Sequence, residues 1–128
     1  MDVRVFLVED LGRTRSALAD LLGTLDGFRV VGAACTEAEA NLWLDEHANG
    51  WDLAIVDLML EQGSGMSVLS RCNAQPGRGR VVVFSGYASP AIREHCLKLG
   101  ADAVFDKAEP EALMAWCRDL LARENSGP

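Results

Sequence analysis

The sequence predicts a single α/β domain in which helices cover both faces of a five-stranded parallel sheet. Two observations lead to this prediction. Short, almost wholly apolar runs alternate with segments of helical periodicity, and the alternation repeats five times in 128 residues. Runs of this kind are typical of strands buried on both faces, as in parallel sheets. Right-handed crossovers then give a doubly wound sheet, and the length suits one hydrophobic core.

The apolar runs define the strands. Val3 to Val8 is apolar except for Arg4, and the later runs are equally rich in valine, alanine and phenylalanine. Such short runs bounded by polar or glycine residues favour strands over helices. The predicted strands are residues 3–8, 28–33, 52–56, 81–84 and 103–105.

Periodicity and capping residues define the first two helices. Residues 14–24 form the first helix, because leucines 18, 21, 22 and 25 fall on one stripe. Gly27 separates it from the second strand. Thr36 and Glu39 have the spacing of a capping box, which opens a helix that continues through Leu44.

The later helices have clearer boundaries. Residues 57–65 read as a polar loop, and a short helix at 66–73 follows it. Ser89 and Pro90 suit the N-cap and first position of a helix that Gly100 ends. Pro110 opens the last helix, whose inner face carries apolar residues 113, 116, 117, 120 and 121.

Composition and charge disfavour several classes of function. The formal net charge is −7 with no cluster of lysine and arginine, which disfavours direct binding to nucleic acid or to an anionic membrane. No apolar stretch approaches the ~20 residues that span a bilayer, and a strand pattern begins at Val3 without a signal peptide. The four cysteines are scattered, so we expect free thiols in a cytoplasmic protein. Residues 1–128 form one domain, with a core at about 3–121 and a polar tail or linker start at 122–128.

Polar side chains follow four of the five predicted strands. Glu9 and Asp10 follow the first strand, Asp57 the third and Ser85 the fourth, and Lys107 comes shortly after the fifth. The carboxyl ends of parallel strands share one edge, and ligands bind in the crevice outside it. Three neighbouring carboxylates repel one another unless a cation neutralises them, so the pattern predicts a metal site.

Each of these residues has a simpler explanation when taken singly. Aspartate and serine after a strand commonly cap a helix or stabilise a turn, and a lone lysine is commonly a solvated loop charge. Their coincidence at one sheet edge favours a site. Other sites are disfavoured: Gly63-Ser64-Gly65 lacks the rest of a dinucleotide fingerprint, no P-loop sequence occurs, and His47 and His95 lack zinc-ligand spacing. Ser85 has no histidine base at this edge, which disfavours a serine hydrolase.

The sequence resembles the receiver domain of two-component response regulators, in particular chemotaxis-regulator-like receivers. The resemblance covers Val3 to about Leu121. It rests on the acidic pair at 9–10, the segment 57–60 leading to 63–65, the Ser85-Gly86 step and the Phe105-x-Lys107 sequence. It implies a flavodoxin-like sheet with strand order 2-1-3-4-5.

The resemblance also implies a phosphoryl-transfer site. Asp57 would accept a phosphoryl group from a sensor histidine kinase or a histidine phosphotransfer protein. Mg²⁺ would be held by Glu9 or Asp10, by Asp57 and by the backbone carbonyl of Met59. Independently, carboxylate oxygens suit Mg²⁺, and a carboxylate can act as a phosphoryl acceptor.

Four further roles follow from the same resemblance. Ser85 and Lys107 would contact the phosphoryl oxygens, and Phe105 would be the aromatic side chain that changes rotamer. The partner surface, for an effector or a second copy, would be the face formed by the helix after Ser89, the strand 103–105 and the last helix. Met59 and Tyr87 would lie beside the path of the hydrolytic water. Both are bulky and neither is a base near neutral pH, so we expect slow dephosphorylation.

Two departures from the family pattern and one rival interpretation remain. Most relatives have proline where Glu61 and Ala108 stand. Because a non-proline cis peptide costs ~3 kcal/mol, we expect Lys107-Ala108 to be trans, which reshapes the loop that carries Lys107.

The rival interpretation is a pseudo-receiver that is never phosphorylated. It would bind a partner through the face formed by the helix after Ser89, the strand 103–105 and the last helix.

Overall fold

The fold is the predicted doubly wound sheet, with five parallel strands in the order β2-β1-β3-β4-β5. The computed structural model describes residues 2–75, 78–86 and 88–125. The elements are β1 (Val3–Val8), α1 (Gly12–Gly23), β2 (Phe28–Ala34), α2 (Glu37–Glu46), β3 (Leu53–Val56), α3 (Gly65–Ala74), β4 (Arg80–Ser85), α4 (Pro90–Lys98), β5 (Ala103–Asp106) and α5 (Pro110–Asn125).

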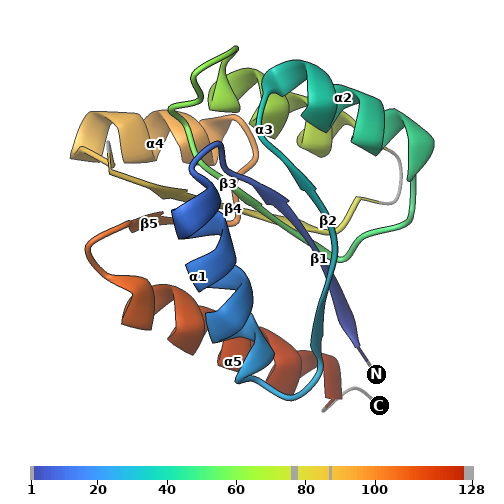
Figure 1. Cartoon of the computed structure of the whole chain (residues 1–128). Helices are drawn as coiled ribbons and strands as arrows, with labels where there is room; N and C mark the ends of the chain where they lie inside the picture. Colours follow the sequence, from blue (N-terminus) through green and yellow to red (C-terminus); the bar gives the residue numbers. More distant parts are fainter. Residues whose placement is uncertain (1, 76–77, 87, 126–128) are drawn as a thin grey trace.

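The helices form a layer on each face of the sheet. Figure 1 shows α1 and α5 below the sheet and α2, α3 and α4 above it. Neighbouring strand residues serve opposite layers: Val5 and Leu7 pack toward α1 and α5, whereas Phe6 and Val8 pack toward the other three helices. All four side chains are at most 1% exposed. Burial on both faces explains why the central strands are almost continuously apolar.

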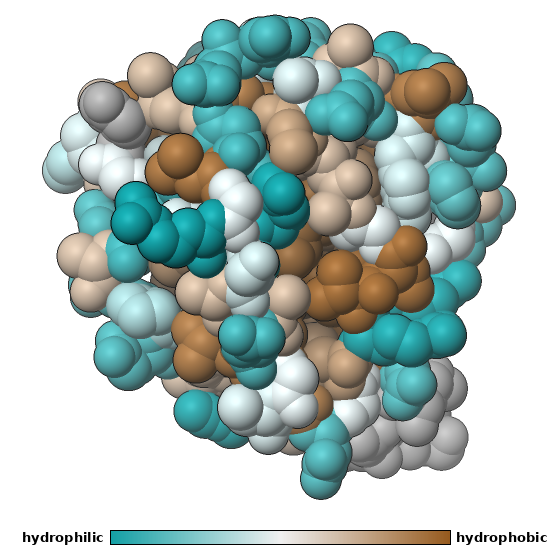
Figure 2. All heavy atoms as spheres, in the orientation of Figure 1, coloured by the Kyte–Doolittle hydropathy of each residue, from teal (hydrophilic) through white to brown (hydrophobic). Residues whose placement is uncertain are grey.

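Among the described residues, the large apolar side chains on the outer surface are scattered. Figure 2 shows brown areas separated by teal and white residues, with one brown area lying over the edge strand β2. Val30 of that strand is 37% exposed. The other large apolar side chains classed as exposed are Leu11, Leu21, Leu42, Met59 and Leu97. Within the described residues, no helix is long and apolar enough to cross a membrane.

The predicted caps are present. The Thr36 hydroxyl accepts a hydrogen bond from the Glu39 N–H at 3.1 Å, and Ser89 caps α4 by accepting from the Ile92 N–H at 3.3 Å. Gly100 follows α4 with a φ of +110°, which only glycine adopts without strain. A Cβ at Gly100 would also lie 2.3 Å from the Asn73 side chain. The sequence signals for these boundaries therefore have direct structural causes.

Most element boundaries lie within two residues of the predicted ones, and α5 differs most. This helix continues to Asn125, into the polar segment that the sequence assigned to a tail. Polar residues are compatible with a helix end that needs no buried face. The prediction of free thiols is confirmed, because the thiols of Cys72, Cys96 and Cys117 are buried and free and that of Cys35 is partly exposed and free.

Strand register brings the carboxyl ends of the central strands to one edge. Val56 of β3 pairs with Val8 of β1 and with Val83 of β4. On the far side of β4, Ser85 pairs with Asp106. The residues that directly follow these positions are therefore neighbours across strands, as the sequence predicts.

Candidate functional site

Three carboxylates meet at the carboxyl edge of β1 and β3. Glu9 and Asp10 follow β1, and Asp57 follows β3. One oxygen from each carboxylate lies within 4.8 Å of the others. Glu9 is 3% exposed and Asp57 5% exposed, while Asp10 is partly exposed. The predicted convergence of these three residues is therefore present in the fold.

Lys107 completes this group, which we call the acidic site (Glu9, Asp10, Asp57 and Lys107). Its Nζ lies 2.6 Å from Glu9 Oε1 and 2.8 Å from Asp57 Oδ2. Lys107 reaches both carboxylates although Ala108 follows it instead of proline. The described residues contain no cis peptide bond, so the Lys107-Ala108 peptide is trans as expected.

The acidic site has more negative than positive charge. Three carboxylates face one ammonium group, which leaves two negative charges when all four groups are ionised. Burial raises the pKa of Glu9, although the hydrogen bonds from Lys107 and from the Leu11 N–H oppose this shift. Burial alone would lower the pKa of Lys107, but its hydrogen bonds and charge interactions with Asp57 and Glu9 together raise it. The lysine is thus held as a cation.

Backbone N–H groups fix the orientation of each carboxylate. The Met59 N–H donates to Asp57 Oδ1 at 3.2 Å, and the Leu11 N–H donates to Glu9 Oε2 at 3.2 Å. The Glu61 N–H donates to Asp10 Oδ2 at 2.7 Å. These bonds tie the loops after β1 and β3 to the acids themselves.

Gly65 lets the loop after β3 pass close to Asp57. A Cβ at Gly65 would lie 1.9 Å from the Asp57 carbonyl oxygen and 2.6 Å from the Leu58 Cα. Both are backbone atoms, so no side-chain rotation relieves the clash. The Gly65 N–H donates to the Leu58 carbonyl at 3.1 Å. Glycine at this position therefore holds α3 against the segment that carries Asp57.

A cavity of about 320 Å³ lies over Asp57. Its walls are Asp10, Leu11, Asp57, Met59, Gly86 and Lys107. Leu11 is 52% exposed and Met59 53% exposed, so two apolar side chains flank the entrance to a charged floor. Sequence reasoning did not identify Leu11 or Gly86 as site residues. The sequence signal for Leu11 was its position directly after Asp10, and Gly86 was noted only as part of the Ser85-Gly86 step.

Two further predicted residues, Ser85 and Phe105, lie near the carboxyl ends of β4 and β5. Ser85 is fully buried at the end of β4, and its carbonyl accepts the Lys107 N–H at 3.2 Å. Phe105 of β5 is partly buried and packs against Trp116 of α5, with ring centroids 6.5 Å apart and planes at 64°. Tyr87, predicted to lie beside the path of a hydrolytic water, is outside the described residues.

The donor set fits a hard divalent cation. Among the described residues, all side-chain donors of the cluster are carboxylate oxygens, and no thiol or imidazole takes part. Mg²⁺ and Ca²⁺ prefer such oxygens, and a charge of +2 equals the excess negative charge of the site. Glu9, Asp10 and Asp57 are the residues that would hold it.

A comparison with protein families identifies this arrangement. The family model of the response regulator receiver domain matches residues 5–118, which is most of the chain. The chain belongs to this family. Its sheet order and the positions of its acids agree with that assignment.

Individual relatives agree with this family assignment. The receiver domain is 34% identical over 103 residues to a cyclic di-GMP phosphodiesterase from Thermotoga maritima, covering 80% of this chain but only 26% of that protein. A solved LuxR-family response regulator from Aurantimonas is 24% identical, with a TM-score of 0.84 over 95% of this chain and 86% of that one. A response regulator from Burkholderia pseudomallei, solved with a phosphorylated aspartic acid, a calcium ion and citrate, is 29% identical. Its TM-score is 0.76, covering 96% of this chain and 73% of that one.

Proposed function

We propose that this receiver domain is a phosphorylation switch in which Asp57 accepts a phosphoryl group from a histidine donor. The observation that carries the proposal is the buried Asp57 carboxylate at the floor of an open cavity, with an ammonium 2.8 Å away and two further carboxylates beside it. The related regulator from Burkholderia pseudomallei, which was solved with a phosphorylated aspartic acid, supports the same chemistry.

The transfer step is a substitution at phosphorus. An oxygen of the Asp57 carboxylate forms the new P–O bond while the P–N bond to the donor imidazole breaks, and the electron pair of that bond leaves with the imidazole nitrogen. The protein's part in such a step is positioning and charge neutralisation. The Met59 N–H orients one Asp57 oxygen, and Lys107 is placed to neutralise negative charge that arrives with the phosphoryl group.

Mg²⁺ is the cofactor we assign to Glu9, Asp10, Asp57 and the Met59 carbonyl. When bound, it supplies positive charge that neutralises phosphoryl oxygens. The chain's own contribution is to hold the acids in place before the metal arrives, through the Leu11 and Glu61 N–H groups. Since Lys107 contacts Glu9 and Asp57, it competes with a cation for the same two carboxylates.

We assign the output of the switch to the face formed by α4, β5 and α5. Ser85 ends β4 beside Asp106 of β5, and its carbonyl accepts the Lys107 N–H. Lys107, which contacts Asp57, comes two residues after Phe105, whose ring packs against Trp116. When Ser85 turns toward a phosphoryl group, Phe105 gains room to turn inward and loses its contact with Trp116. The partners in this proposal are a histidine kinase or phosphotransfer protein as donor, and an effector or second copy at this face.

Incubation with acetyl phosphate, a small-molecule phosphodonor, tests the function. The expected result is a rise in intact mass by one phosphoryl group that requires Mg²⁺. The matched control is Asp57→Asn, which keeps the shape of the side chain and removes the nucleophilic oxygen. An unmodified parent protein in the presence of Mg²⁺ would favour the pseudo-receiver, which binds partners without phosphorylation.

A further inference from the structure

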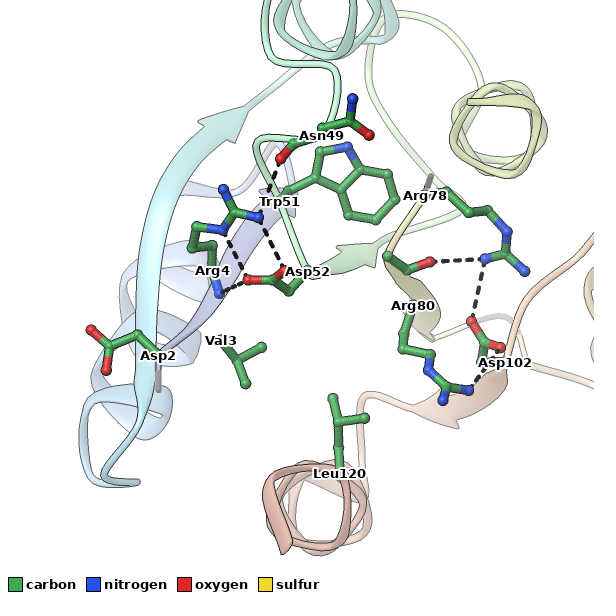
Figure 3. Close-up of a pocket in the computed structure, with 11 residues that line it drawn as sticks. Asp2, Val3, Arg4, Asn49, Trp51, Asp52, Arg78, Arg80, Asp102 and Leu120 are labelled. Atoms are coloured by element: carbon green, nitrogen blue, oxygen red, sulfur yellow. Dashed lines mark hydrogen bonds and ion pairs between the residues drawn. The ribbon is translucent and has the colours of Figure 1, made fainter. Parts of the chain in front are cut away.

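A second cavity lies at the opposite edge of the sheet, where the strands begin. Its volume is about 460 Å³, larger than the cavity over Asp57. Figure 3 shows charged side chains from the starts of β1, β4 and β5 and from the residue before β3 around this space. We call it the arginine pocket, after Arg4, Arg78 and Arg80 in its walls.

One side of the arginine pocket is an internally satisfied ion pair. Arg4 Nε lies 2.9 Å from Asp52 Oδ2, and its Nη2 lies 3.1 Å from Oδ1. The Arg4 N–H also donates to Asp52 at 2.8 Å, and Arg4 Nη2 donates to the Asn49 carbonyl. The hydrogen bond from Arg4 lowers the pKa of Asp52, and the same pairing raises that of Arg4. This pair closes the sheet edge and has little capacity for a ligand.

Three arginines and three aspartates (Asp2, Asp52 and Asp102) line the pocket, so its formal charge sums to zero, and the excess of positive charge is local to the side with Arg78 and Arg80. Arg78 Nη1 lies 3.5 Å from Asp102 Oδ2, and Arg80 Nη1 lies 3.9 Å from Asp102 Oδ1. Both separations exceed the ~2.7–2.9 Å of a charge-assisted hydrogen bond. The shortest hydrogen bond to the Asp102 carboxylate comes instead from the Val81 N–H, at 2.8 Å. Two guanidinium groups therefore share one carboxylate at long range, which leaves a local charge of +1.

The role of Asp102 at the start of its strand does not explain why two arginines lie beside it. Asp52 and Asp102 occupy matching positions, since each accepts the N–H of a residue near the start of a neighbouring strand. Asp52 is served by one arginine in this pocket and Asp102 by two. A guanidinium carries five N–H donors, of which Arg78 Nη1 donates to the Gly79 carbonyl and to Asp102. In the described part of the chain, the Arg78–Arg80 pair thus retains donor capacity.

The space beside this pair has an apolar lining. Figure 3 shows Val3 and Leu120 below the two ion-pair systems, and Trp51 in the upper part between Arg4 and Arg78. These side chains are 5%, 2% and 2% exposed, so they offer a narrow apolar surface rather than an open patch. A binding site with few polar groups at one end and apolar walls orients a ligand by its charged end.

We propose that the arginine pocket binds a small organic anion, whose carboxylate or phosphate group sits between Arg78 and Arg80 while its apolar body lies along Val3 and Leu120. Guanidinium forks match both anionic groups in geometry. A cation finds less support, because Asp52 is saturated by Arg4 and Asp102 is surrounded by two arginines. This proposal does not depend on phosphorylation of Asp57.

Titration of ¹⁵N-labelled protein tests the proposal, with benzoate and phenyl phosphate as probes and benzyl alcohol as the neutral comparison. Mg²⁺ is left out, so that the acidic site repels anions. The indole N–H of Trp51, which donates to Gln75 Oε1 at 3.0 Å, and the backbone amides of Arg80 and Asp102 report on the pocket. We expect saturable shifts of these signals with the anions and none with benzyl alcohol. A Met59 amide that remains unshifted excludes binding at the acidic site.

Charge variants make the test specific. Arg80→Gln removes a half-exposed guanidinium and is expected to weaken anion binding about tenfold. Arg80→Lys, which keeps the charge and loses the fork, should weaken it less. Arg71→Gln is the matched control, because it removes the same charge from a surface pair with Asp45 on the α2–α3 side. Equal shifts with all three probes, or an Arg80→Gln protein that binds anions as the parent does, would overturn the proposal.

Discussion

Replacing Lys107 with methionine probes the balance of charges that holds the acidic site together. Methionine matches lysine in length but has neither charge nor donor. The change leaves Glu9 and Asp57, which are 3% and 5% exposed, without the ammonium that lies 2.6 and 2.8 Å from them. Removing one partner of a buried ion pair costs about 3–5 kcal/mol. Because the Lys107 side chain is 25% exposed, we expect about 3 kcal/mol less unfolding free energy at neutral pH.

The pH dependence of this loss identifies its cause. The folded-state pKa of Glu9 is already raised by burial, and losing the lysine raises it further. A carboxyl group with a raised folded pKa costs stability above that pKa, and the cost disappears as the pH falls toward the unfolded value. The deficit of Lys107→Met should therefore shrink by about 1 kcal/mol between neutral pH and about pH 5. Mg²⁺ should also reduce the deficit and bind the variant more tightly than the parent, since it no longer competes with the ammonium.

Urea unfolding at the two pH values, with and without Mg²⁺, measures these effects. The control is Lys98→Met, which removes an exposed lysine whose carboxylate partner Glu94 lies 3.5 Å away. It should change the unfolding free energy by less than ~0.5 kcal/mol. A Lys107→Met protein as stable as this control, or a deficit that is constant with pH, would show that Lys107 does not stabilise the buried charges of Glu9 and Asp57.

Three further predictions concern the acidic site. Glu9→Gln removes a buried charge and should raise the metal-free unfolding free energy by about 1 kcal/mol at neutral pH, while calorimetry shows Mg²⁺ affinity falling about tenfold or more. Gly65→Ala places a Cβ 1.9 Å from the Asp57 carbonyl oxygen; urea unfolding should show a loss of about 2–3 kcal/mol, and phosphorylation should fall. Met59→Asn combined with Tyr87→Glu should speed aspartyl-phosphate decay about tenfold, followed by intact mass after the donor is removed, because polar groups can orient water where bulky ones crowd it.

The fold and the acidic site could be predicted from the sequence because each depends on a pattern of neighbouring residues. Apolar runs mark strands buried on both faces, and residues that directly follow those runs share one edge in a parallel sheet. Glu9, Asp57 and Ser85 satisfy that rule directly, and the structure places all three as expected. The boundary of α5 was less accessible, because a polar helix end and a polar tail have the same composition.

The contacts between distant segments could not be predicted in the same way. The bond from the Glu61 N–H to Asp10 and the close approach of Gly65 to Asp57 depend on loop conformation, for which the sequence gives only a glycine and polar residues. The arginine pocket could not be predicted from the sequence. Arg4, Arg80 and Asp102 stand at the starts of strands, where a charged residue is ordinarily a solvated end. Their common location appears only once the strand register is known.

Locating the modified residue tests the proposal that Asp57 is the phosphoryl acceptor of this receiver domain. Reduction of an acyl phosphate with borohydride converts the aspartate to homoserine, which peptide mass spectrometry can place in the sequence. After incubation with phosphodonor and Mg²⁺, we expect homoserine at position 57 and unmodified aspartate at Asp10. Modification at Asp10 or at any residue outside the acidic site, or no modification in a protein shown to bind Mg²⁺, would contradict it.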